Sequence, residues 1–233
     1  MIWKRILKMT IQQGISTAKM KEKARNLSKK AEELRQSDRL QAAGNYYTAS
    51  AHEYAGVVTE HTFPGADKTV SALGELLNAA TCYRLVGDTY RVNNRCELGT
   101  LLAEDYLNYI DSGEWDENSF VPFRRGAWHE FIGDLRTVAE KEEASNAYEK
   151  AIDIYISAGD WEVVYGEKEH LRIASYLRSV RRGLGHDISE DAPEMQGSGT
   201  TFSEWVWYKQ ENLPKYLSQL EAQGSWPTQI DQS

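Results

Sequence analysis

Residues 128–151, WHEFIGDLRTVAEKEEASNAYEKA, are the stretch of the chain that best indicates its fold. In the first half, Trp128, Phe131, Ile132 and Leu135 lie three or four positions apart, the spacing that places side chains on one face of an α-helix. In the second half, small residues alternate with an aromatic at the same spacing. The stretch therefore predicts two helices joined by a short turn, with their apolar faces packed together.

The same periodicity extends outward through most of the chain. It is interrupted at turn signals such as Gly87-Asp88 and Gly159-Asp160. We predict helices over 15–36, 38–60, 67–86, 88–111, 119–138, 140–158, 161–183 and 201–222. Only five prolines occur among many good helix formers, which also favours an all-α fold.

These elements predict four parts of the chain. Residues 1–14 form an amphipathic, basic N-terminal segment, and residues 15–183 form a helical domain. Residues 184–200 are polar and rich in helix breakers, which predicts a flexible linker. Residues 201–233 form a C-terminal helix and tail that dock on the helical domain.

Three helix pairs align with one another, which is the pattern of a repeat. The inward positions of the first helices are Leu27, Lys30, Ala31 and Leu34; Leu76, Ala79, Ala80 and Tyr83; and Trp128, Phe131, Ile132 and Leu135. Those of the second helices are Ala43, Tyr47 and Ser50; Val92, Cys96 and Gly99; and Ala144, Tyr148 and Ala151. We expect Ala144 and Ala151 to lie at a close helix crossing opposite Trp128.

This arrangement of large, small and aromatic residues resembles the tetratricopeptide repeat, and residues 128–151 carry the resemblance best. The offsets of 49 and 52 residues between units, and Lys30, Val92, Cys96 and Gly99, depart from the usual repeat. Long helices and the Ala-Gly-Asp turn at 158–160 look more like the α-SNAP type of array. The resemblance implies stacked antiparallel helix hairpins, an α-solenoid that acts as a protein-binding adaptor or scaffold. A compact helical bundle has the same periodicity and remains the alternative.

Composition and charge limit the functional classes. Hydrophobic residues make up 41% of the 233 residues and charged residues 27%, which is typical of a soluble protein. Residues 1–36 carry a net charge of +7, so the rest of the chain carries −15. An acidic body argues against nucleic-acid binding. Two cysteines are too few for a disulfide scaffold, so we expect a cytoplasmic protein.

We expect neither catalysis nor a cofactor. The sequence has no glycine-rich phosphate loop and no nucleophile elbow. Glu167 and His170 have the Glu-x-x-His spacing of di-iron bundles, but the chain has no second such pair. We therefore assign no metal ligand, and a metal- or ligand-binding enzyme built on these two residues is the alternative function.

Arginine recurs at one aligned position, as Arg35, Arg84 and Arg136. In tetratricopeptide arrays, the first helices line the concave groove, so the resemblance places these side chains against a partner. Planar guanidinium groups bind carboxylates with two parallel hydrogen bonds. We therefore expect a protein partner with an acidic or helical segment. The alternative is that each arginine pairs with a glutamate of its own chain.

Apolar residues at the two ends of the chain predict further contacts. The N-terminal set is Ile2, Trp3, Ile6 and Leu7. It suits a membrane surface, which would make the chain a peripheral membrane-associated adaptor, or packing on the array or on a second subunit. Phe202, Trp205 and Trp207 make a C-terminal cluster that is too apolar to stay exposed. We expect this cluster to cap its own array, or a second copy in a homo-oligomer.

Overall fold

The computed structural model describes residues 17–56, 66–112, 121–160, 168–186 and 199–227. Within these ranges the fold is all-α. The helices are α2 (Thr17–Gln36), α3 (Leu40–Gly56), α4 (Ala66–Leu85), α5 (Thr89–Asp111), α6 (Val121–Val138), α7 (Ala144–Ser157), α8 (Lys168–Gly183) and α9 (Phe202–Gln223). Each predicted helix has a counterpart, whereas the segment 1–14 and most of the linker 184–200 fall outside the described residues.

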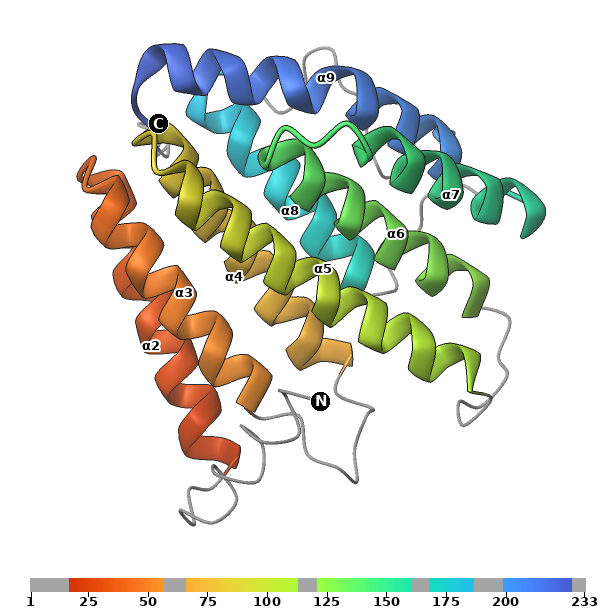
Figure 1. The fold of residues 1–233 in the computed structure, drawn as a ribbon, viewed down its shortest axis with the longest axis horizontal. Coiled ribbons are helices and arrows are strands. Elements are labelled where there is room, and N and C mark those ends of the chain that lie inside the picture. Colours follow the sequence, from red (N-terminus) through yellow and green to blue (C-terminus); the bar gives the residue numbers. More distant parts are fainter. Residues whose placement is uncertain (1–16, 57–65, 113–120, 161–167, 187–198, 228–233) are drawn as a thin grey trace.

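The first six of these helices form antiparallel hairpins, α2 with α3, α4 with α5 and α6 with α7 (Figure 1). Each hairpin packs on the next, through α3 against α4 and through α5 against α6. None of the described helices is both long enough and apolar enough to span a bilayer.

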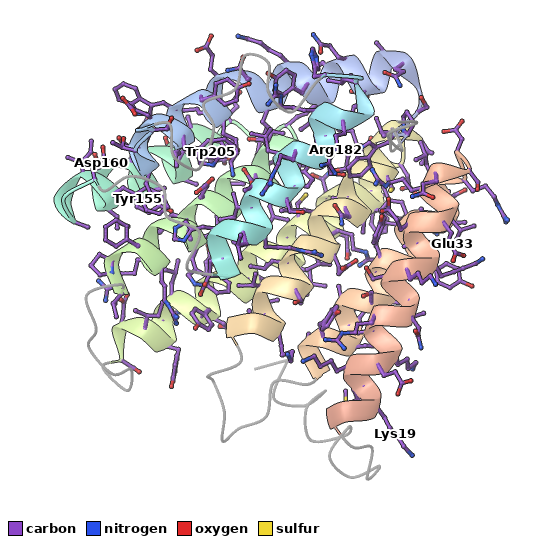
Figure 2. All side chains as sticks on the ribbon, turned by 180° about the vertical axis from the view of Figure 1, so that it is seen from behind. Lys19, Glu33, Tyr155, Asp160, Arg182 and Trp205 are labelled. Carbon is purple, nitrogen blue, oxygen red and sulfur yellow. The ribbon has the colours of Figure 1, made fainter. Side chains whose placement is uncertain are left out.

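The last two helices close the molecule. Seen from behind, α8 lies in front of α4 and α6, and it packs against both (Figure 2). Helix α9 packs against α6, α7 and α8 and reaches α4. An open repeat array makes contacts only between neighbouring repeats. The contacts of α4 with α8 and α9 join parts of the chain that are far apart in sequence, so the described part is compact.

Glycines, rather than the expected alanines, make the close crossing of α6 and α7. Ala151 is fully buried, but Ala144 is only half-buried at the start of α7. Trp128 does not face Ala144, because its ring stacks on Tyr106 of α5 with centroids 4.1 Å apart. The rings of α7 lie instead against Gly126 and Gly133 of α6, where a Cβ atom would collide with them.

Candidate functional site: a basic cleft between α2 and α8

A cleft of about 620 Å³ lies between α2 and α8, with α4 as its floor. Its walls are polar. Helix α2 contributes Arg25, Ser28, Lys29, Glu32 and Arg35, and α8 contributes Arg172, Ser175, Tyr176, Arg178, Ser179 and Arg182. The floor from α4 consists of Ser71, Gly74, Glu75 and Asn78. In Figure 2, α4 lies between α8 and α2, and Arg182 is labelled on α8.

Each wall is one face of a helix. The residues of α2 recur at intervals of three, four and seven positions, and so do those of α8, which places each set on a single stripe. A helix face directed at neighbouring helices is usually apolar. These two faces are polar instead, so they leave a cleft where apolar side chains would have closed the gap.

Two contacts fix the walls relative to each other. Near one end, Arg172 Nη2 and Ser28 Oγ both donate to Glu75 Oε1, at 2.7 and 3.0 Å. Near the other end, Arg35 Nη1 donates to Ser179 Oγ at 3.2 Å. Positions 28 and 172 are separated by 144 residues, as are positions 35 and 179. Helices α2 and α8 therefore run in the same direction and in register.

Glu75 anchors the first of these contacts. Its side chain is buried, and burial raises the pKa of its carboxyl group, against the opposing effect of Arg172 and Ser28. The Arg172 guanidinium lies directly over Gly74, where a Cβ atom would collide with its Nε. The glycine thus lets the arginine reach across α4 to the buried carboxylate.

The C-terminal segment completes the second contact. Trp226 is fully buried, and its indole donates from Nε1 to the carbonyl oxygen of Ser179 at 3.0 Å. The Arg35 guanidinium lies 4.4 Å from the centroid of the Trp226 ring and is bonded to the Glu32 carboxylate. Trp226 therefore links α8 to α2 through Ser179 and Arg35, two residues that line this end of the cleft.

The charge of the cleft is opposite to that of the chain. Six cationic side chains line it, Arg25, Lys29, Arg35, Arg172, Arg178 and Arg182, against the carboxylates of Glu32 and Glu75. The surplus is four positive charges in a chain whose net charge is −8. A surplus of one sign in a concave site raises the local concentration of ions of the opposite sign, so the charge of this cleft suits an anionic ligand.

The three arginines that the sequence singled out are not brought together. Arg35 lines the basic cleft, as just described. Arg84 is buried and holds helix ends together: it bonds to Glu140, to Glu221 of α9 and to the carbonyl oxygens of Thr137 and Val138. Arg136 lies beside Glu104, 3.9 Å away, in a second groove between α5 and α7.

This second groove has a volume of about 640 Å³ and is the weaker candidate. Leu107, Ile132 and Ile154 give it an apolar part. Its acidic residues are Glu104, Asp111 and Asp153, and its basic residues are Arg125, Arg136 and Lys150, so the two signs balance. Because the charges of this groove balance, they do not indicate whether its ligand would be an anion or a cation.

Sequence reasoning missed the arginines of α8. Arg172, Ser175, Ser179 and Arg182 follow one another at helical spacing, but none of them is among the candidate site residues of the sequence analysis. The serines between these arginines were the feature that could have indicated a cleft. Small side chains leave space between helices, whereas a face exposed to solvent does not need them.

Of the two residues considered for a metal site, His170 lies in a buried polar cluster. His170 is buried, with its Nε2 3.2 Å from the Tyr155 hydroxyl, and Glu167 falls outside the described residues. Lys209 of α9 bonds to Glu130 and Asp134 of α6, and all three are fully buried. The described residues contain no cluster of ligand side chains that could hold a metal ion.

The structure describes the apolar cluster at the C-terminal end of the chain but not the one at the N-terminal end. Phe202 and Trp205 of α9 are buried on their own molecule, whereas Trp207 is 60% exposed. The Trp205 indole donates to Glu130 at 3.2 Å. Ile2, Trp3, Ile6 and Leu7 lie outside the described residues.

Comparisons with protein-family models, with curated proteins and with solved structures found no match for this chain.

Proposed function

We propose that the protein is an interaction module that binds an acidic segment of a partner protein in the basic cleft between α2 and α8. The observation that carries the proposal is the surplus of four positive charges in a cleft of an otherwise acidic chain. Arginine clusters in grooves bind acidic and phosphorylated motifs, because each guanidinium group donates two parallel hydrogen bonds to an oxyanion.

The resemblance to tetratricopeptide arrays supports the same proposal. In those arrays the first helix of each hairpin lines the groove that holds the partner. Here α2 and α4 are the first helices of their hairpins and form one wall and the floor of the cleft. Under this proposal the molecule is a helical-repeat adaptor in which α8 supplies the opposite wall.

A binding measurement tests the proposal directly. The probe is a fluorescent ten-residue peptide of alternating Glu and Ser, and its counterpart with Gln for Glu measures background. The test variant is Arg25→Gln, Lys29→Gln, Arg182→Gln, which changes three exposed side chains of the cleft. The control, Lys23→Gln, Lys30→Gln, Lys215→Gln, removes the same charge from exposed positions elsewhere.

The expected result is that only the test variant loses affinity for the Glu peptide, by about tenfold or more, which corresponds to roughly 1.4 kcal/mol. Binding should also weaken with added salt, because exposed charges are screened over about 8–10 Å at physiological ionic strength. Equal losses in the test and control variants would mean that only the overall charge matters, and the cleft would be abandoned as the site.

A further inference from the structure

The cations are not spread evenly along the basic cleft. Because α2 and α8 are in register, positions on the two helices can be placed on one axis, with a rise of about 1.5 Å per residue. The first end of the cleft holds Arg25, Lys29 and Arg172, at the level of Glu75. The second end holds Arg35, Arg178 and Arg182, at the level of Ser179.

Each end has the same net charge. Glu75 offsets one cation at the first end, and Glu32 offsets one at the second, through its bond to Arg35. Each end therefore keeps a surplus of two positive charges. The levels of the two clusters differ by about eight residues along the helix axes, or roughly 12 Å. Ser175 and Asn78, which are uncharged, line the stretch between them together with Glu32, whose carboxylate is bonded to Arg35.

We infer that the cleft recognises two acidic side chains of one extended segment, four residues apart. The inference rests on the proposed function and specifies the pattern of its ligand. An extended chain rises about 3.3 Å per residue and directs every second side chain to the same side. Residues four apart therefore point the same way, about 13 Å from each other, which matches the separation of the two clusters.

The separation of the clusters favours the extended form. A helix places residues seven apart on one face only about 10.5 Å from each other, and residues eight apart are about 12 Å from each other but rotated by about 80° around its axis. Acidic residues four apart in an extended segment match the separation and also point to the same side.

A series of peptides tests the spacing. Each peptide has eleven residues of Gly and Ser with two Glu residues, placed two, four or eight positions apart, and a fourth peptide has one Glu. The full-length protein is titrated with each at low salt and followed by NMR. The indole N–H signal of Trp226 is a suitable probe, because Trp226 lies against Arg35 and Ser179 at the second end of the cleft.

The expected result is that the peptide with spacing four binds at least about fivefold more tightly than the other two. Two paired variants then locate the contacts: Arg25→Gln, Lys29→Gln at the first end, and Arg178→Gln, Arg182→Gln at the second. Each should remove the preference and reduce binding to that of the one-Glu peptide. Unchanged thermal unfolding of both variants shows that the loss is not one of folding.

Two other outcomes count against the inference in different ways. Equal binding of all three two-Glu peptides would overturn the spacing rule but leave the proposed function standing. No binding of any acidic peptide, including the alternating Glu and Ser peptide, would overturn both. An Ala-rich helical peptide with two Glu residues seven positions apart serves as a further probe. If it binds more tightly than the peptide with spacing four, the cleft recognises a helix and not an extended segment.

Discussion

Gly133 lies in the middle of α6, where glycine normally weakens a helix. Replacing a mid-helix glycine by alanine usually stabilises by about 1 kcal/mol. Here a Cβ atom at position 133 would lie 2.6 Å from the Tyr148 ring, which is itself fully buried. Gly133 is thus required for packing against Tyr148 and does not serve as a flexible joint.

We therefore expect Gly133→Ala to lower the free energy of unfolding by about 1–3 kcal/mol, the usual cost of overpacking a core. Urea denaturation measures it. Ser145→Ala, at a half-buried position near the start of α7, serves as a control for the gain in helix propensity. A more stable Gly133→Ala protein would mean that Tyr148 can move aside at little cost.

Two buried titratable groups have opposite effects on stability as the pH changes. Burial raises the pKa of Asp134 from 3.8 to about 6, so the folded protein binds a proton that the unfolded chain has lost between about pH 4 and 6. Asp134 therefore makes the fold more stable as the pH falls. Burial lowers the pKa of His170 from 6.5 to about 3, so protonation of the unfolded chain destabilises the fold in the same window.

We expect that removing one of these two groups leaves the pH dependence of stability governed by the other. Relative to wild type, Asp134→Asn should lose stability more steeply as the pH falls from 6 to 4, and His170→Gln should gain stability over that range. The slope should change by up to about 1.4 kcal/mol per pH unit, the value of one proton. Denaturation at a series of pH values measures it, and parallel curves for all three proteins would contradict the assignment.

At the scale of elements, one face of α9 packs on the rest of the molecule and the opposite face is exposed. Trp205 faces inward, is 3% exposed and bonds to Glu130, whereas Trp207, two positions on, is 60% exposed. We expect Trp205→Ala to cost about 3–5 kcal/mol, as for other buried tryptophans. Trp207→Ala should stay within about 0.5 kcal/mol. Thermal unfolding of the two variants makes the comparison, and equal losses would place both rings in an interface.

The position of α9 was predictable because its signals are local. The predicted helix 201–222 corresponds to Phe202–Gln223. Thr201 caps its first turn, Glu204 bonds back to the backbone of Thr201, and Gly224 ends the helix in the left-handed conformation. Each of these residues lies within a turn of the helix end, so the sequence pattern is sufficient to locate it.

The partners of α8 were not predictable in this way. Arg172 meets Glu75 across 97 residues, and Arg35 meets Ser179 across 144. Helical periodicity states which face of a helix is apolar, but it does not state which other helix that face will meet. The aligned arginines show the same limit, because Arg35 and Arg84 occupy equivalent positions and bond to different parts of the chain.

At the scale of the whole molecule, the contacts between α2 and α8 should make unfolding cooperative. Open repeat arrays lose cooperativity because each unit touches only its neighbours. Here the first described hairpin is bonded to α8 directly at one end of the cleft, through Arg35 and Ser179, and at the other end through Glu75 of α4. We expect the unfolding curves from far-ultraviolet circular dichroism and from tryptophan fluorescence to coincide, as they do for a two-state protein.

Cutting the two links should separate these curves. In the variant Arg35→Gln, Arg172→Gln, the links to Ser179 and Glu75 are lost. Part of the helical signal should then disappear at a lower urea concentration than the rest. A variant that keeps one sharp transition would show that apolar packing alone couples the hairpins.

The register of α2 and α8 also sets the order of events during synthesis of the chain. The first wall of the cleft is complete by Arg35, whereas the second wall begins at Arg172, and Trp226, which contacts Arg35, comes later still. Ribosomes add about 5–20 residues per second, so α2 waits roughly 7–30 seconds for the synthesis of α8. We expect the polar stripe of α2 and the carboxylate of Glu75 to face water during that interval, because the side chains of α8 that cover them have not yet been made.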